Sequence, residues 1–241
     1  MNLKTVGLCI SVIVILASTT LAFAVTPGES LKKNFPNIPP IDNITPSNVS
    51  GLYEVIAGQQ VFYYAPDAEC IVVGQIVTKE GKNLTKEKQQ ELEQKRIAQK
   101  VKDIPLDKAV KIGKGKNQVI EITDPDCPYC RKAAEFFAGR KDVTKYVFLY
   151  PLDMHKQAEE KVRYILCAKD KAKAYEQAMT GKLDDMKFKV CKDANVDTLL
   201  KAHKEVASQL GVTGTPFFII NGQPVVGADI PLIEKLLGSK D

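Results

Sequence analysis

Two cysteines separated by two residues are the part of the chain whose residue types and spacing most clearly carry chemistry. Cys127 and Cys130 enclose Pro128-Tyr129, and helix-forming residues follow from Arg131 onward. At the start of a helix, unpaired backbone N–H groups and the positive end of the helix dipole stabilise a thiolate. The second sulfur is one helical turn away, within reach of a disulfide bond. The pattern predicts a redox pair in which Cys127 is the exposed attacking thiolate and Cys130 the covered resolving thiol.

Metal binding is the alternative for this pair, because Cys-x-x-Cys is also half of a zinc site. The other half would come from Cys167 and Cys191, which form no second Cys-x-x-Cys, while His155 and His203 lack ligand spacing. The sequence therefore favours redox chemistry, and we expect neither a metal nor a cofactor.

A glutamate lies six residues before Cys127, in the apolar run 118–123. The run is short and rich in β-branched residues, so it predicts a buried strand. Glu121 would then be a buried carboxylate under the pair, able to take the proton of Cys130 when a mixed disulfide resolves. A surface glutamate on an edge strand is the alternative.

The expected export of the chain predicts the redox state of three further cysteines. Cys167 and Cys191 enclose 23 residues, and in an exported protein they predict a structural disulfide, with two free buried thiols as the alternative. The loop-entropy model assigns such a bond roughly 3–4 kcal/mol. Cys70 has no partner left, so we expect a buried free thiol, or else an intermolecular bridge across a dimer.

Residues 1–24 predict a secretory signal that is cleaved after Ala24. Lys4 precedes an apolar run, and Ala22-Phe23-Ala24 forms a small-x-small cleavage site. Cleavage would leave no stable membrane anchor, whereas an uncleaved anchor is the alternative. The chain has no endoplasmic reticulum retention tetrapeptide at its end, which favours a bacterial periplasm.

The charge of the chain gives no sign of nucleic acid binding. The formal net charge is +5, and lysines are spread among acids along the whole sequence. Such a mixture is typical of a solvated surface rather than a phosphate-binding stripe.

Residues 25–80 predict a small α+β domain and residues 81–104 a linker helix. The domain is expected to hold a helix at 27–34 and strands at 52–56, 60–64 and 70–77. So small a meander cannot bury a sufficient core alone, so we expect it to dimerise. The helix at 86–102, capped by Thr85, carries few apolar residues, which is typical of a solvated spacer.

Residues 105–241 predict a thioredoxin fold with a helical insertion. The expected order is a strand at 109–112, the strand before the pair, the cysteine helix, a strand at 146–150, helices between 155 and 210, a hairpin at 217–226 around Asn221-Gly222, and a helix at 230–237. The chain as a whole is thus α+β, with an α/β second domain.

Pro216 opens the first strand of this hairpin, a position that a strand tolerates. In this fold class we expect a cis Thr215-Pro216 bond beside the redox pair, with an ordinary loop proline as the alternative. The backbone of Thr215 would then pair with an extended substrate strand. We expect Tyr129, Thr215 and Pro216 to contact the substrate.

Several of these motifs together resemble the DsbC/DsbG periplasmic disulfide isomerases. They are 127–130, 167–171, Ala178-Met179-Thr180-Gly181-Lys182 and Gly211-Val212-Thr213-Gly214-Thr215-Pro216. The resemblance implies a homodimer joined through the N-terminal domains, with redox sites facing a shared cleft. It also implies the attacking and resolving roles of Cys127 and Cys130, the cis-proline pair, and the structural disulfide of the DsbC type.

The chain combines features of both types within this family. Pro128-Tyr129 matches the DsbG dipeptide, whereas the additional cysteine pair matches DsbC. Glu121 is more similar to the acid of the DsbA oxidases than to the apolar residue of DsbC, and Cys70 belongs to neither pattern. The subtype stays open.

The resulting interpretation is a periplasmic thiol:disulfide interchange enzyme that isomerises or reduces misoxidised exported proteins and is kept reduced by a DsbD-like membrane donor. A holdase chaperone with the same dimeric cleft, a DsbA-like thiol oxidase and a zinc-stabilised binding module are the alternatives. Residues 25–102 favour the isomerase, because an oxidase is competent as a monomer.

Overall fold

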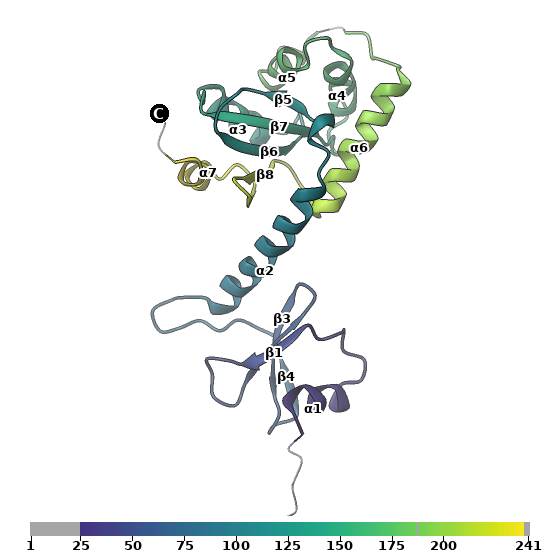
Figure 1. The fold of residues 1–241 in the computed structure, drawn as a ribbon. Helices are drawn as coiled ribbons and strands as arrows, with labels where there is room; N and C mark the ends of the chain where they lie inside the picture. The colour runs from purple at the N-terminus through teal and green to yellow at the C-terminus, as the bar shows by residue number, and fades with distance from the viewer. Residues whose placement is uncertain (1–24, 187, 239–241) are drawn as a thin grey trace, which may run out of the picture. The chain divides into compact units, whose positions relative to one another are not determined.

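The computed structural model describes residues 25–186 and 188–238, and the predicted signal at 1–24 lies outside these residues. The chain divides into two compact units, the first ending at Gln75 and the second beginning at Ile76 (Figure 1). The unit boundary therefore precedes the predicted one, and residues 76–104 belong with the second unit.

The first unit is a four-stranded antiparallel sheet with one helix. The helix is α1 (Pro27–Asn34), and the strands pair in chain order: β1 (Asn43–Pro46), β2 (Tyr53–Ala57), β3 (Gln60–Ala65) and β4 (Cys70–Val72). Leu31 of the helix packs on Val55, Phe62 and Tyr64 of the sheet. Ser30 and Asn34 bond the Tyr64 hydroxyl at 2.7 and 3.1 Å, which fixes the helix on the sheet.

Two expectations for this unit are wrong, and one of its strands is unexpected. The strand predicted at 70–77 ends at Val72. Strand β1 is not predicted, because a four-residue run that ends in proline gives almost no strand signal. Cys70 is exposed rather than buried. It and Val72 point away from the core while Ile71 points toward it, because successive side chains in a strand alternate between faces.

Helix α2 (Leu84–Lys100) is fastened to the second unit and is not a free spacer. Ile97 is fully buried in a cluster with Val206 and Leu210. Arg96 Nη2 donates to the carbonyl of Leu210 at 2.8 Å. The cap also differs from expectation: Asn83 caps the helix, while the buried hydroxyl of Thr85 accepts from the amide of Ile76.

The second unit is built on a five-stranded sheet in the order β5-β7-β6-β8-β9. Its strands are β5 (Val110–Ile112), β6 (Asn117–Thr123), β7 (Val143–Leu149), β8 (Phe217–Ile220) and β9 (Gln223–Val226), and its helical elements are η1 (Val101–Asp103), η2 (Leu106–Lys108), α3 (Pro128–Ala138), α4 (Ala158–Cys167), α5 (Lys171–Met179), α6 (Ala194–Leu210) and α7 (Ile230–Leu237). Only β6 and β7 pair in parallel.

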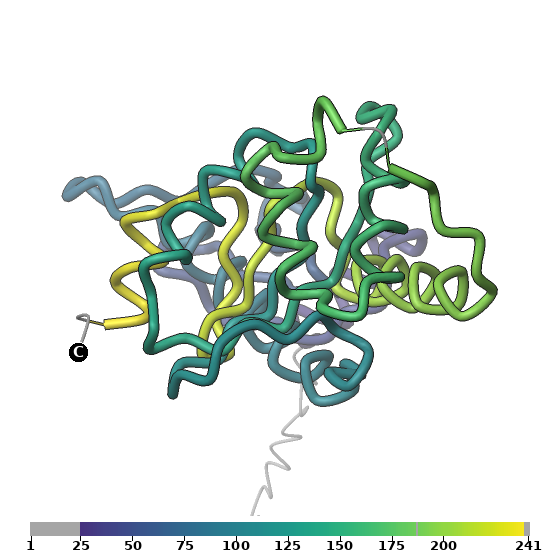
Figure 2. Tube along the Cα trace, turned by 90° about the horizontal axis from the view of Figure 1, so that it is seen from above, coloured from purple at the N-terminus to yellow at the C-terminus, as the bar shows by residue number. Residues whose placement is uncertain are grey.

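Helices cover both faces of this sheet. Helices α3 and α7 pack on one face around Phe137, Phe218 and Ile233. Helix α6 and the end of α2 pack on the other face. The C-terminal hairpin, drawn in yellow, lies beside β6 (Figure 2). This arrangement confirms the predicted thioredoxin fold, with α4, α5 and part of α6 as the helical insertion.

Asn221 and Gly222 have the backbone that the sequence predicts, and Gly211 has a similar left-handed conformation. Asn221 and Gly222 join β8 to β9 with φ of 48° and 86°, in the left-handed region that the shortest hairpin turns require. Gly211 ends α6 with φ of 73°, the conformation that glycine favours at a helix end. The turn at Asn221-Gly222 therefore ends the strand that follows Pro216.

Candidate active site

The cysteine pair lies where strand β6 passes into helix α3. Pro128 is the first helical residue, and Cys127 is the residue that caps the helix, with φ of −76° and ψ of 121°. Proline suits this first position because its missing N–H would have no partner there. Asp124-Pro125-Asp126 forms the turn between strand and helix. The local sequence thus places the first sulfur at the positive end of the helix.

Both cysteines carry free thiols, and neither is open to solvent. The exposed fraction is 5% for Cys127 and 0% for Cys130. Cys127 is therefore less exposed than its predicted role suggests, because residues 213–216 approach it. Its Sγ lies 3.4 Å from the carbonyl oxygen of Thr215, to which it donates when it is protonated.

Hydrogen bonds lower the pKa of Cys127 to about 5. The largest contribution is a hydrogen bond from the Cys130 thiol, and burial opposes it. The backbone amides of Cys130 and Tyr129 and the hydroxyl of Thr215 add to the lowering. Each of these groups stabilises the thiolate, so Cys127 is ionised at neutral pH.

Cys130 has the opposite character. Burial first, and its hydrogen bond to Cys127 second, raise its pKa far above the ordinary value of a thiol. The amide of Asp124 donates to its Sγ at 3.4 Å. The side chains of Thr123 and Thr215 favour its thiolate. Both hydroxyls are buried, and neither has a hydrogen-bond partner among the residues that the structure describes. The sequence offered no signal for Thr123 beyond its place at the end of the strand.

The bond between Thr215 and Pro216 is cis. The amide of Gly227 donates to the Pro216 carbonyl at 2.8 Å, which holds this segment along β9. A groove of about 270 Å³ runs beside it, lined by Glu93, residues 210–217, Val226 and Gly227. Tyr129 is 67% exposed and does not line this groove. The structure thus brings Thr215 and Pro216 to the pair and leaves Tyr129 on the surface beside it.

Glu121 is fully buried in the central strand β6, so the surface alternative is wrong. Its carboxylate accepts from Lys145 Nζ at 2.8 Å and from the Tyr175 hydroxyl at 3.0 Å. Lys145 also donates to the Tyr175 oxygen at 3.1 Å. Neither partner is among the predicted site residues, although a lysine in the middle of the apolar strand 143–149 is a signal that the sequence offers.

A second carboxylate fixes the turn before Cys127. Asp124 is buried, and its Oδ1 accepts from the amide of Asp126 at 2.7 Å. Its Oδ2 accepts from the amide of Leu152 at 2.7 Å and lies 2.8 Å from Nδ1 of His155. These bonds hold the turn that directs the Asp124 amide to Cys130.

Cys167 and Cys191 are joined by a disulfide. The bond links the end of α4 to the segment before α6. It closes a loop that contains α5 and the turn after it, so it restrains the whole helical insertion.

Within residues 25–186 and 188–238, no group of three or more histidine, cysteine or acidic side chains could hold a metal ion. None of the helices in these ranges combines the length and the hydropathy needed to cross a bilayer.

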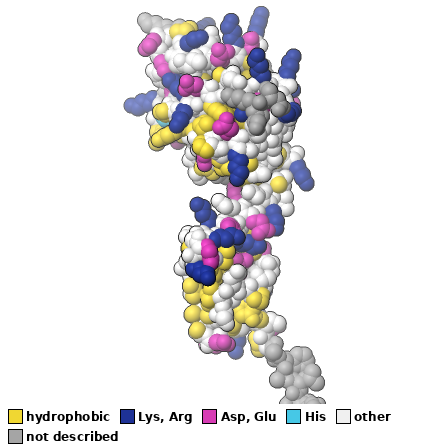
Figure 3. All heavy atoms as spheres, turned by 90° about the vertical axis from the view of Figure 1, so that its left-hand side faces the viewer, with side chains coloured by type: hydrophobic (Ala, Val, Ile, Leu, Met, Phe, Trp, Pro, Cys, Tyr) yellow, Lys and Arg dark blue, Asp and Glu magenta, His cyan; other side chains and the backbone are white. Residues whose placement is uncertain are grey.

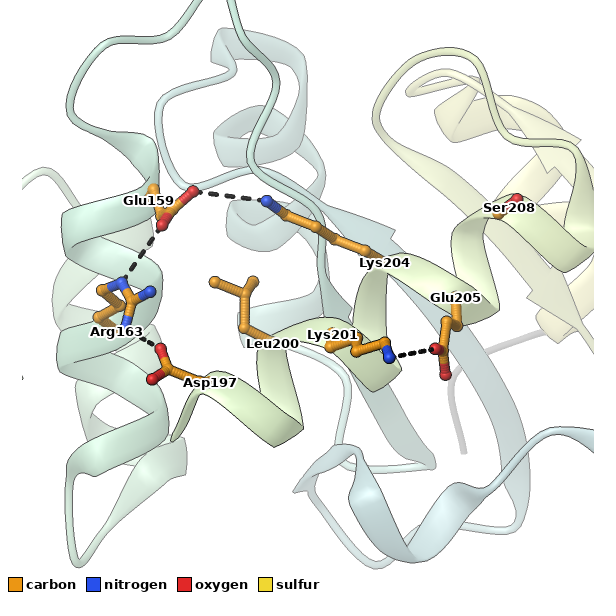
Figure 4. Close-up of a pocket in the computed structure, with 8 residues that line it drawn as sticks. All are labelled: Glu159, Arg163, Asp197, Leu200, Lys201, Lys204, Glu205 and Ser208. Carbon is orange, nitrogen blue, oxygen red and sulfur yellow. Dashed lines mark hydrogen bonds and ion pairs between the residues drawn. The ribbon is translucent and has the colours of Figure 1, made fainter. Parts of the chain in front are cut away.

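A separate groove of about 460 Å³ lies between α4 and α6 (Figure 4). Arg163 binds Glu159 at 3.3 Å and Asp197 at 2.6 Å, and Lys204 approaches Glu159 at 3.4 Å. None of the residues that line it is a cysteine. Its charges serve to join the two helices.

Two family models match the chain. Residues 104–229 match the thioredoxin-like domain, and residues 21–86 match the N-terminal domain of disulfide bond isomerase proteins. The second match covers the unit that carries β1 to β4. Together they confirm the resemblance that the motifs indicate.

Relatives with known names point in the same direction. A protein of Bordetella avium named "Probable thiol:disulfide interchange protein DsbC" is 32% identical over 54% of this chain and 46% of its own length. A Bordetella pertussis protein of the same name is 31% identical over 74% of this chain and 61% of its own length. The chain thus spans about half to three-fifths of these relatives.

A solved structure supports the fold alone. The thiol-disulfide exchange protein alpha-DsbA2 of Wolbachia pipientis superposes with a TM-score of 0.51 at 16% identity, over 62% of this chain and 96% of that chain.

Proposed function

The chain belongs to the thioredoxin-like domain family, and we propose that it is a thiol:disulfide interchange enzyme that isomerises or reduces misoxidised exported proteins. The observation that carries this proposal is the acidic Cys127 sulfur at a helix start, hydrogen-bonded to the buried Cys130 thiol. Low thiol pKa and a neighbouring second thiol are the two properties that disulfide exchange needs.

The reaction starts with the Cys127 thiolate. It attacks one sulfur of a client disulfide, a mixed disulfide forms, and the other client sulfur leaves as a thiolate. In isomerisation, a client thiolate then attacks the mixed disulfide and releases Cys127. In reduction, Cys130 loses its proton and attacks the Cys127 sulfur, so the client leaves reduced and the pair leaves oxidised. A DsbD-like membrane reductant would return the two electrons.

Glu121 is our proposed acceptor for the proton of Cys130. It lies buried on the strand that leads to the pair, and it accepts a hydrogen bond from the Tyr175 hydroxyl. The charge on Cys130 contributes to raising the pKa of Tyr175, after burial and Glu121. Lys145 keeps the carboxylate paired, which limits the cost of burying it. Among the described residues, these three groups, from β6, β7 and α5, form a hydrogen-bonded cluster.

Thr215 and Pro216, with Tyr129, are our proposed client contacts. The groove beside the 213–216 segment supports this, because an extended peptide can lie along it with its disulfide at Cys127. Tyr129 adds an exposed aromatic ring within the reactive dipeptide. A client segment with apolar side chains fits these surfaces.

We further propose a homodimer formed through the first unit. Its core contains few residues, and apolar side chains lie on its surface (Figure 3), among them Val49, Val72 and Val73, the last 84% exposed. Strand β4 is an edge strand of its sheet, and such edges pair readily with a second copy. Export to the periplasm with cleavage after Ala24 remains part of the same proposal.

A substitution of the attacking cysteine tests the proposed function. Mature protein with Cys127→Ser should lose reactivation of scrambled ribonuclease, while Cys70→Ser, the matched control, should retain it. Aggregation of an unfolded cysteine-free client measures the holdase alternative in the same variants. Reactivation that survives Cys127→Ser would overturn the enzyme assignment. Rapid oxidation of reduced ribonuclease without isomerisation would favour the oxidase.

A further inference from the structure

Four charged side chains meet at the turn that carries the reactive cysteine. Asp126, directly before Cys127, accepts from Lys161 Nζ of α4 at 2.5 Å and from Arg131 Nη2 of α3 at 3.2 Å. Lys161 also binds Asp184, in the turn after α5, at 2.5 Å. Arg131 binds both oxygens of Asp184 at 2.6 and 2.8 Å.

The cluster is held firmly. The Lys161 side chain is only 3% exposed, which is rare for a lysine without charged partners. Burial lowers its pKa, but the two carboxylates outweigh burial and raise it. The pKa of Asp184 falls to about 2, chiefly through Arg131. Lys161, Arg131 and Asp184 are therefore charged at neutral pH. With Asp126, the cluster holds two basic and two acidic side chains, so its formal net charge is zero.

The cluster also forms a hydrogen bond with the backbone of the turn. Arg131 Nε donates to the carbonyl of Pro125 at 2.8 Å. The helical insertion, through Lys161 and Asp184, is thereby joined to the residues that place Cys127.

Two carboxylates of this turn, those of Asp124 and Asp126, come just before Cys127, whose sulfur must carry a negative charge. A like charge nearby raises the pKa of a thiol, and a paired carboxylate does so far less. Asp124 has its own partners, whereas Asp126 depends on Lys161 and Arg131.

We propose that Lys161 is a positioning residue for Cys127: with Arg131 it holds and neutralises Asp126, so that the thiolate forms at the helix start without a free carboxylate beside it. This inference rests on the proposed function. It assigns the helical insertion a part in the acidity of the active site.

Besides the four residues of the cluster, other charged or titratable groups face the turn from the elements packed against it. They are Asp124 in the turn, Cys130 in α3, His155 after β7, and the buried Glu121, Lys145 and Tyr175 beneath the pair. The 213–216 segment contributes only hydroxyls and backbone groups.

The test is the pH dependence of Cys127 alkylation by iodoacetamide, followed by mass spectrometry on full mature protein carrying Cys70→Ser. Lys161→Met should raise the midpoint from about 5. A rise of one pH unit makes alkylation at pH 5 about fivefold slower. Lys161→Arg should restore the wild-type profile, and Lys201→Met, on an 80% exposed side chain, should leave it unchanged.

Replacing the carboxylate of Asp126 should shift the midpoint of Cys127 alkylation in the opposite direction. Asp126→Asn should lower the midpoint, and adding it to Lys161→Met should bring the midpoint back toward wild type. Asp126→Asn also carries the test if Lys161→Met does not fold. An unchanged midpoint in Lys161→Met, or a raised one in Asp126→Asn, overturns this inference and leaves the proposed function standing. A wild-type thiol that titrates like free cysteine overturns the proposed function instead.

Discussion

The sulfur of Cys127 lies 3.4 Å from the carbonyl oxygen of Thr215, a residue 88 positions further along the chain. The hydroxyl of the same threonine helps to lower the pKa of Cys127 and favours the thiolate of Cys130. One residue from the segment before β8 thus acts on both thiols. The acidity of the pair depends on the folded unit as well as on the start of the helix.

Thr215→Val should raise the pKa of Cys127, because it removes a hydroxyl that lowers this pKa and leaves the backbone carbonyl in place. The midpoint of Cys127 alkylation should move above about 5. Thr213→Val, at an exposed position in the same segment, is the matched control and should not move it. Equal shifts in both variants would mean that the segment, and not the hydroxyl, sets the acidity.

The sequence predicted what local patterns encode. The helix at 27–34, the turn at Asn221-Gly222 and the cysteine at a helix start follow from capping, turn chemistry and hydrophobic pattern, and the structure has each of them. It could not predict contacts between distant segments. Lys161 reaches Asp126 across 35 residues and Ile97 packs on α6, because tertiary packing alone brings those elements together.

Glu121→Gln should slow the release of a mixed disulfide by Cys130, because an amide cannot take the proton. A positioned base contributes about a hundredfold or more to such a step. The measurement is single-turnover release of a client peptide from a preformed mixed disulfide at Cys127, read by reversed-phase chromatography. Glu135→Gln, exposed on α3, is the control. Release at the wild-type rate in Glu121→Gln would remove this carboxylate from the reaction.

His203 should make the protein less stable below about pH 6.5. Its Nδ1 accepts from the Leu149 amide at 2.9 Å, and its Nε2 lies 2.9 Å from the Lys108 carbonyl, so the ring is held neutral. Burial lowers its pKa in the folded state. The unfolded chain therefore binds a proton that the folded chain does not, and the free energy of unfolding falls as pH drops through that window.

Thermal melts between pH 7 and pH 5 measure this effect. His203→Asn should melt at a lower temperature but with a flatter pH profile. The carboxylates of Asp142 and Asp184, whose pKa values are about 2, lose their stabilising charge only well below that range. A wild-type melting temperature that does not change over this range would contradict the prediction.

Removing the Cys167–Cys191 disulfide should lower the free energy of unfolding by about 3–4 kcal/mol, the loop-entropy value for a separation of 24 residues. Urea denaturation of Cys167→Ser/Cys191→Ser against wild type gives the difference. Cys70→Ser should be neutral, because that side chain is exposed and makes no disulfide. A double variant as stable as wild type would show that the segment around α5 is held by its packing alone.

Oxidised mature protein should contain one reactive thiol, at Cys70. The Cys127–Cys130 and Cys167–Cys191 bonds use the other four cysteines that follow residue 24, and Cys70 is exposed on the edge strand β4. Labelling with N-ethylmaleimide without denaturant should therefore modify one site per chain, and Cys70→Ser should abolish it. If the thiol instead bridges two copies, the wild type will show no label and a dimer band that reductant removes on a non-reducing gel. That outcome would place β4 at the interface between the copies, since a disulfide brings the two Cα atoms within about 7 Å.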